Sequence, residues 1–181
     1  MDRHFELTQT QRLSVLIGAE TEARLPKLLE AMQPDGVVVV YDSALEDLAI
    51  RVANAVGAKT LLPIAEVQIA KRLAVIDELA EKLHAAEATR ATVMIAVGGG
   101  TLTDLAGFAA SIYLRGIRLV SCPTTTLAMC DAALGGKNGV DHCGLKNRLG
   151  TIRQPNAIVL DTNWLQTLPD EMYREGIVEV I

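Results

Sequence analysis

The sequence is poor in aromatic residues and in basic charge, and each shortage narrows the class of protein. Only 3% of the 181 residues are aromatic, and the 17 lysines and arginines are fewer than the 22 aspartates and glutamates. The net charge of −5 and the scattered basic residues argue against a nucleic-acid binder. No apolar run approaches the ~20 residues needed to cross a bilayer. We therefore expect a soluble protein whose partners are small molecules, with no nucleic acid and no membrane among them.

Cysteine is also scarce, and the three cysteines are Cys122, Cys130 and Cys143. Their spacing gives no tight metal-ligand pair, and a free cysteine usually packs as a small apolar side chain. The first ten residues are polar and charged rather than a basic start followed by an apolar stretch. The sequence therefore predicts a cytoplasmic protein with reduced thiols.

Apolar residues make up 50% of the chain, and short apolar runs alternate with longer helical patterns. This alternation predicts an α/β fold, a Rossmann-like doubly wound, mostly parallel sheet with helices on both faces. Strands are expected at residues 12–17, 37–41, 59–62, 92–97, 118–122 and 157–161. Helices are expected from about residue 21, at 44–56, at 104–114, at 126–134 and from Pro169-Asp170. One further long helix should carry an inner stripe of Ile69, Leu73, Ile76, Leu79 and Leu83, and residues 135–150 should form a functional loop.

The expected strand at 92–97 runs directly into Gly98-Gly99-Gly100-Thr101. Glycines let the backbone approach a pyrophosphate, and the helix that follows directs its free amides and positive dipole end at the phosphates. The run lacks the usual G-x-G-x-x-G spacing, so a purely structural turn is an equal alternative. Asp104 would repel a phosphate, and it either caps the helix start or accepts a hydrogen bond from a ribose or substrate hydroxyl.

Asp42 lies at the carboxyl end of its expected strand. An acidic residue there can bind both ribose hydroxyls of an adenosine and discriminate against a 2′-phosphate, which favours NAD over NADP. The alternative is that Asp42 caps the helical segment that begins at Ser43.

A denser group of polar residues follows between positions 123 and 147. It comprises Pro123-Thr124-Thr125-Thr126, Asp131, Gly135-Gly136-Lys137 and Lys146-Asn147. Lysines, an asparagine, hydroxyls and a carboxylate separated by glycine suit a polyhydroxylated, phosphorylated or carboxylated ligand. A solvated loop would explain the charge but not the clustered glycines and threonines, so a binding function is favoured.

Taken together in chain order, these segments resemble the signature blocks of 3-dehydroquinate synthases, a family of sugar-phosphate cyclases. The blocks are GGGTLTDLAGFAASIYLRG (98–116), PTTTLAMCDAALGGKNGVD (123–141), LKNRLG (145–150), QP (154–155), TLP (167–169) and GIVEVI (176–181). The resemblance implies an NAD-binding Rossmann-like domain at 1–168 and the start of a C-terminal, helical metal-binding domain at 169–181.

The resemblance also implies roles for individual residues. The implied NAD site is lined by Asp42, Lys71, Gly99, Gly100, Thr101, Asp104, Thr124, Thr125, Lys137, Lys146, Thr167 and Leu168. For Lys71 the acidic neighbour that the family pattern expects is displaced, and Glu66 or no residue takes its part. The implied catalytic residues are Asp131, Lys137, Lys146, Asn147 and Arg115, the last reaching into the other subunit's site of a homodimer. A surface charge is the alternative for Arg115, and pairing with a nearby carboxylate is the alternative for Lys146.

Glu179, in GIVEVI, matches the family's carboxylate ligand to a divalent metal, zinc or cobalt. The two histidine ligands of the family have no counterpart in His4, His84 or His142, so one glutamate cannot complete a catalytic metal site. We expect the chain to end inside the metal-binding helix and to be inactive alone. Without the resemblance, Glu179 would be an ordinary solvated residue of a helix.

The implied activity is that of a carbon–oxygen lyase of the shikimate pathway for aromatic amino acids. It converts 3-deoxy-arabino-heptulosonate 7-phosphate to 3-dehydroquinate and phosphate through transient oxidation by NAD, elimination of phosphate and intramolecular aldol closure. Two features leave a sedoheptulose 7-phosphate cyclase (2-epi-5-epi-valiolone synthase-like) open as an alternative: Thr103, where many of these synthases have glycine, and Lys146-Asn147-Arg148-Leu149-Gly150, which resembles both groups. A metal-dependent alcohol dehydrogenase and a stand-alone nucleotide-binding module also stay open at this point.

Overall fold

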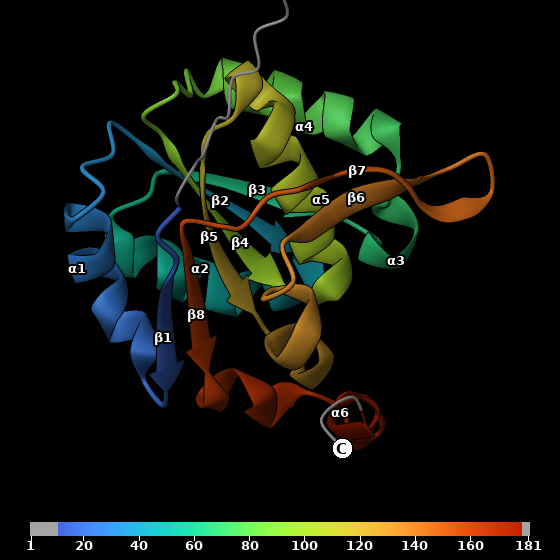
Figure 1. Cartoon of the computed structure of the whole chain (residues 1–181). Helices are drawn as coiled ribbons and strands as arrows, with labels where there is room; N and C mark the ends of the chain where they lie inside the picture. The colour runs from blue at the N-terminus through green and yellow to red at the C-terminus, as the bar shows by residue number, and fades with distance from the viewer. Residues whose placement is uncertain (1–10, 179–181) are drawn as a thin grey trace, which may run out of the picture.

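A computed structural model describes residues 11–178 and shows a six-stranded sheet in which every pair of neighbouring strands is parallel. The strand order is β1-β8-β5-β4-β2-β3 (Figure 1). The strands are β1 (Ser14–Gly18), β2 (Val37–Asp42), β3 (Thr60–Ile64), β4 (Val93–Gly98), β5 (Arg118–Pro123) and β8 (Ala157–Asp161). The predicted Rossmann-like α/β fold is therefore confirmed.

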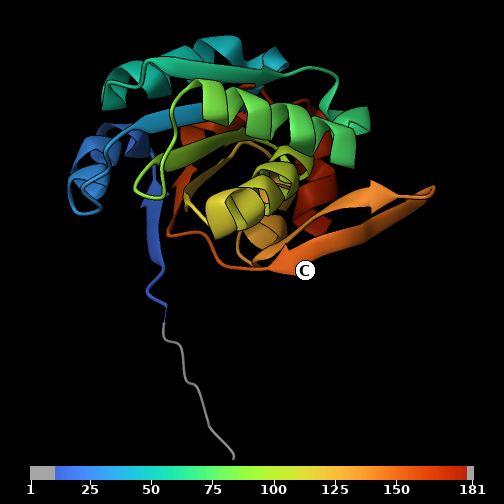
Figure 2. The same ribbon diagram turned by 90° about the horizontal axis from the view of Figure 1, so that it is seen from above.

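Helices cover both faces of this sheet, as Figures 1 and 2 show. On one face α1 (Leu25–Glu30) and α2 (Glu46–Val56) pack on one cluster of buried side chains, and on the other α4 (Leu73–Ala85) and α5 (Gly100–Ile112) pack on a second. Every residue of β4 is buried, because a central parallel strand is covered from both sides. Short 3₁₀ segments η1 (Thr21–Arg24), η2 (Ser43–Leu45), η3 (Tyr113–Arg115) and η5 (Thr162–Thr167) connect these elements.

The segment predicted as a loop at 135–150 is instead an antiparallel hairpin of β6 (Lys137–His142) and β7 (Leu145–Ile152). The hairpin projects from the body of the molecule, as seen in Figure 2. Asn138 anchors its base, because its side-chain amide donates to Gly136 O and Arg153 O, each at 2.9 Å. Two of the glycines that suggested a loop, Gly139 and Gly150, are positions where the backbones of β6 and β7 lie close together.

The long helix predicted across Ile69 and Leu73 is wrong, because the chain breaks between α3 (Val67–Ala70) and α4. Ile69 and Leu73 are 59% and 41% exposed and do not belong to the inner stripe, whereas Ile76, Leu79 and Leu83 are buried as expected. Arg72 has extended backbone and forms a parallel bridge with Asp141 of β6. Pairing with the hairpin has overridden the local helical pattern.

Two other predicted helices differ from the structure in their bounds. α5 begins at Gly100, with Gly99 as its N-cap, so Asp104 lies beyond the first turn and does not cap the helix. The segment predicted as a helix at 126–134 is helical at residues 126–132, and its part from Ala128 to Ala132 is π-helical.

The last described helix, α6 (Asp170–Val178), begins where Pro169-Asp170 predicted it. The Thr126 hydroxyl donates to Tyr173 O at 3.1 Å, and a Cβ at Gly176 would overlap the backbone nitrogen of Leu127. α6 is thus docked at the carboxyl edge of the sheet (Figure 1). Among the described residues, no helix combines the length and apolar character needed for a membrane span.

Candidate functional site

The candidate site begins where the strand order reverses. From β2 the chain moves outward to β3, then returns across β2 to β4 and continues in the opposite direction. Tyr41 is paired with Val97, so Asp42 and Gly98 end two neighbouring strands at the same edge. In open α/β sheets this reversal leaves a crevice at the carboxyl ends of the strands, where ligands bind.

The glycine turn after β4 is held close to its neighbours. A Cβ on Gly99 would lie 3.1 Å from Cγ2 of Thr125, and the Thr124 amide donates to Gly98 O at 3.0 Å. Thr103 N, bonded to Gly99 O at 3.0 Å, closes the first turn of α5. The preceding amides of α5, at Gly100 and Thr101, belong to the group that a helix leaves without an internal partner. The turn is therefore shaped for an anionic group approaching the backbone.

Asp42 does cap the segment after β2. Its Oδ1 accepts from the Ala44 amide at 3.0 Å, so the capping alternative is confirmed. This bond uses one carboxylate oxygen, and binding of a ribose stays a prediction.

A cavity of about 540 Å³ lies between the start of α5, the π-helical turn and the hairpin. Four predicted residues line it together, namely Asp104, Asp131, Lys137 and Asn147. Two lining residues that the sequence analysis missed are Asn138 and Arg148. Arg148 comes directly after Lys146-Asn147, and the basic charge of the LKNRLG block was the signal that could have found it. The cavity combines carboxylates, cations and two amide side chains, the hydrogen-bond acceptors and donors that a charged, hydroxylated ligand needs.

Lys71, at the break between α3 and α4, contacts two residues that line this cavity. Its Nζ lies 2.5 Å from Asp104 Oδ2 and 2.5 Å from Asn147 Oδ1. Burial raises the pKa of the Asp104 carboxyl above its ordinary value, and the hydrogen bond and charge of Lys71 oppose that rise. Asp131 and Asp141 add to the rise through repulsion.

Arg115 and Lys146 stand apart from the cavity lining. Both are exposed, and among residues 11–178 neither makes an ion pair, so the pairing suggested for Lys146 is not found. Leu114 and Arg115 have positive φ angles of 49° and 63°, an uncommon conformation for side chains of this size. Arg153 links the end of α5 to the start of β5, because its guanidinium donates to Ala110 O and Ile117 O, each at 2.9 Å.

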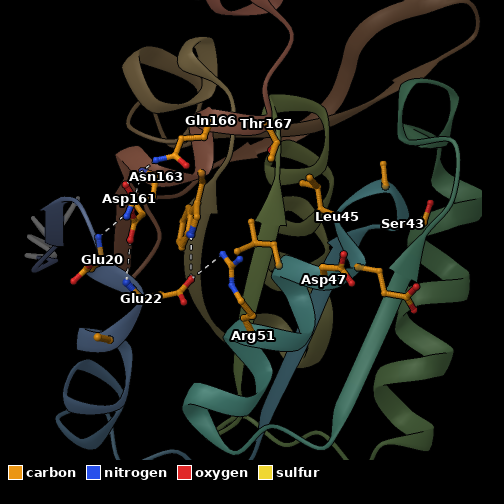
Figure 3. Close-up of a pocket in the computed structure, with 15 residues that line it drawn as sticks. Glu20, Glu22, Ser43, Leu45, Asp47, Arg51, Asp161, Asn163, Gln166 and Thr167 are labelled. Atoms are coloured by element: carbon orange, nitrogen blue, oxygen red, sulfur yellow. Dashed lines mark hydrogen bonds and ion pairs between the residues drawn. The ribbon is translucent and has the colours of Figure 1, made fainter.

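A larger cavity of about 1080 Å³ opens at the carboxyl ends of β1, β8 and β2 (Figure 3). Thr167 and Ser43 lie on its border, and Glu22 accepts from Arg51 at 3.4 Å and from the Trp164 indole at 3.2 Å. Its acidic lining residues are Glu20, Glu22, Glu46, Asp47 and Asp161. Asp161 is 1% exposed: its carboxylate caps η5 and also accepts from the Glu20 and Glu22 amides and the Thr21 hydroxyl at the start of η1. The sequence analysis did not anticipate this cavity, because its residues come from three separate segments, 20–23, 43–51 and 161–167.

A family model described as the 3-dehydroquinate synthase N-terminal region matches residues 61–175. The chain belongs to the 3-dehydroquinate synthase family. It is 40% identical over 167 residues to the 3-dehydroquinate synthase of Saccharolobus solfataricus, a match that covers 92% of this chain and 46% of that protein. It is 52% identical over 111 residues to that of Pyrobaculum islandicum, covering 61% of this chain and 32% of the relative.

Solved structures agree with this family assignment. A 2-deoxy-scyllo-inosose synthase complexed with carbaglucose-6-phosphate, NAD⁺ and Co²⁺ matches with a TM-score of 0.84 and 27% identity, over 92% of this chain and 46% of that one. A 2-epi-5-epi-valiolone synthase from Streptomyces hygroscopicus with NAD⁺ and Zn²⁺ bound matches at 0.80 and 28%, over 98% and 50%. A sulfoacetaldehyde reductase from Bifidobacterium kashiwanohense shares only the fold, at 0.79 and 16%, over 98% and 52%. The chain spans about half the length of these relatives.

The metal site expected from the family resemblance is not formed by the described residues. Among residues 11–178, no three histidine, cysteine, aspartate or glutamate side chains lie close enough to hold a metal ion. Glu179, the predicted ligand, lies outside the described residues.

Proposed function

We propose that this chain provides the nucleotide-binding part and half of the substrate site of a 3-dehydroquinate synthase. The proposed reaction converts 3-deoxy-arabino-heptulosonate 7-phosphate to 3-dehydroquinate and phosphate, in the cytoplasm and in a homodimer. The observation that carries the proposal is the 540 Å³ cavity beside the glycine turn, which Asp104, Asp131, Lys137 and Asn147 line together. Residues 1–168 are proposed as the NAD-binding domain and residues 169–181 as the start of the metal-binding domain.

The glycine turn supports a dinucleotide. At Gly99 a side chain would press against Thr125, so the backbone is the only surface that a ligand meets there. The pyrophosphate would lie against the amides of Gly100 and Thr101 at the positive end of α5. Asp104, Thr124, Thr125 and Leu168 would surround the rest of the nucleotide.

The nucleoside end would extend past Asp42 toward the 1080 Å³ cavity that Thr167 borders. Asp42 keeps one carboxylate oxygen for ribose hydroxyls, since only Oδ1 is used by the cap. Glu46 and Asp47 add negative charge nearby, and a 2′-phosphate would be repelled. The site therefore favours NAD over NADP.

When bound, NAD supplies the transient oxidation of a secondary alcohol of the substrate. Asp131 accepts hydrogen bonds from substrate hydroxyls, while Lys137 and Asn147 donate to oxygens on which negative charge develops. Lys146 and the partner subunit's Arg115 would add positive charge at the rim for the carboxylate or phosphate. A divalent metal, zinc or cobalt, requires ligands beyond residues 11–178, and Glu179 is the one that the resemblance supplies.

The first experiment is calorimetry with NAD and NADP on this chain and on two variants. Asp42→Asn keeps a residue that caps well but lacks the charge that strengthens ribose hydrogen bonds, so NAD affinity should fall about tenfold or more. The difference between the affinities for NAD and NADP should become smaller in the same variant. Asp77→Asn, an exposed aspartate on α4, is the matched control and should leave both affinities unchanged. Equal NAD and NADP affinities in the unaltered chain would contradict the proposal.

A second experiment separates the reaction classes. Release of phosphate from the heptulosonate phosphate without net accumulation of NADH indicates the synthase, and the same result with sedoheptulose 7-phosphate indicates the alternative cyclase. Steady NADH formation from a simple alcohol indicates a dehydrogenase. The assay is run on the protein completed with a metal-binding domain, because NAD binding without turnover by this chain alone fits both the proposed half-enzyme and a stand-alone nucleotide-binding module.

A further inference from the structure

Lys71 lies between Asp104, on the proposed nucleotide side of the site, and Asn147, on the proposed substrate side. Its side chain is only 13% exposed, and that of Asp104 is 20% exposed. Two of the three ammonium protons are directed at Asp104 on α5 and at Asn147 on β7, both at 2.5 Å. At most one proton is left for a ligand.

A second connection runs beside this side chain. The Asp141 backbone amide donates to Lys71 O at 2.8 Å, and the Asp141 carboxylate accepts from the Asn147 backbone amide at 2.7 Å. Asn147 has a φ of 52°, a left-handed conformation that asparagine tolerates better than most residues. The backbone at Lys71 thus fixes β6, and the Lys71 side chain fixes the Asn147 side chain.

We propose that Lys71 is a positioning residue that couples the nucleotide side of the site to the substrate side, by holding Asp104 and Asn147 in one arrangement. This inference rests on the proposed function for the ligands of the two sides. It differs from the direct NAD contact that the family resemblance implies. If Lys71 only contacted NAD, substitutions at Lys71 and Asn147 would change NAD affinity independently. If Lys71 is a bridge, the effect of one substitution on NAD affinity depends on whether the other is present.

The surrounding charges explain why the bridge needs a cation. Asp104 is opposed by the carboxylates of Asp131 and Asp141, and burial also disfavours its charged form. The other cations of the cavity, Lys137 and Arg148, line the same space without an ion pair to Asp104 among the described residues. A neutral side chain at position 71 would leave Asp104 without its compensating charge and Asn147 without a donor.

The test compares Lys71→Met, Lys71→Arg and Asn147→Ala, with Lys59→Met as the control at an exposed lysine. Methionine keeps much of the apolar stem, so packing alone would be preserved. We expect Lys71→Met to weaken NAD binding about tenfold in calorimetry, Lys71→Arg to recover part of the loss, and the control to have no effect. Asn147→Ala should weaken NAD binding about threefold when Lys71 is present and not at all in the Lys71→Met background.

Additive effects of the two substitutions, or no effect of Asn147→Ala in either background, would overturn the bridge while leaving NAD binding intact. Failure of the unaltered chain to bind NAD would refute the proposed function instead. In that case the bridge is tested without nucleotide, by measuring hydrogen exchange at the backbone amides of Asp141 and Asn147. Faster exchange in Lys71→Met than in Lys59→Met supports it, and equal rates overturn it.

Discussion

Replacing Gly107 by alanine sets helix propensity against packing, and we expect packing to decide. Gly107 lies within α5, where alanine is ordinarily more stable than glycine by about 1 kcal/mol. A Cβ there would overlap the Asn138 amide oxygen and lie 2.6 Å from its Cγ. The Asn138 side chain would have to leave, and its two hydrogen bonds at the base of the hairpin would be lost.

The magnitude follows from these opposing effects. Two lost hydrogen bonds cost about 1 kcal/mol each, and forcing a side chain out of a packed position costs about 1–3 kcal/mol. After subtracting the gain in propensity, Gly107→Ala should lower the free energy of unfolding by about 2–4 kcal/mol. With an m-value of about 2 kcal/mol/M, the urea midpoint would fall by about 1–2 M.

The assay is urea unfolding followed by circular dichroism, with Gly36→Ala as the control. A Cβ at Gly36 would lie 3.7 Å from the Thr92 hydroxyl, an ordinary contact, so that variant should match or slightly exceed the stability of the unaltered chain. Adding Asn138→Ala to Gly107→Ala should make the alanine at 107 much less costly, because the remaining contact is with Cβ at 3.2 Å. A Gly107→Ala chain as stable as the unaltered one would refute the close packing of the hairpin on α5.

Three further predictions concern other parts of the molecule. Burial raises the pKa of the Cys122 thiol, so a thiol reagent at pH 8 should label only the two exposed cysteines in the native chain and all three in urea, measured by mass spectrometry. The hydrogen bond from Thr89 holds the pKa of Asp35 below 3.8, so this carboxylate stabilises the fold above its ordinary pKa and the contribution is lost as pH falls through the lowered value. Thr89→Val should raise that pKa in an NMR titration, and an unchanged midpoint would contradict the contact. Gly176→Ala should loosen α6, because its Cβ would overlap the Leu127 nitrogen, and faster proteolysis within α6 is the expected readout.

The sheet could be predicted because its strands are continuous apolar runs. VVVVYD and VMIAVG are too short for helices and too apolar for a one-sided strand, and both became central parallel strands. Asp42 and the glycine turn were placed correctly for the same reason, since the end of each run fixes the edge of the sheet.

The hairpin could not be recognised because glycine has two meanings in a sequence. At 135–150 it suggested a functional loop, yet a Cβ on Gly150 would overlap Asn138 O, and one on Gly139 would lie 2.6 Å from Leu149 O. These glycines permit close approach between strands. Composition alone does not distinguish a glycine needed for its backbone conformation from one needed because a side chain would not fit.

Lys71 shows the same limit at the candidate site. The spacing of Ile69, Leu73 and Ile76 is helical, and nothing local marks the break at Lys71-Arg72. The break depends on Asp141, which lies far along the chain and pairs with Arg72 through a backbone bridge. The Lys71 ammonium is then committed to partners 33 and 76 residues away. The family resemblance could identify the lysine but not its partners, because a pattern of residue types carries no information about which donor is already used. Since most of its donors are engaged within the protein, the positive charge for the proposed phosphorylated substrate must come mainly from other cations, of which Lys137 and Arg148 already line the cavity.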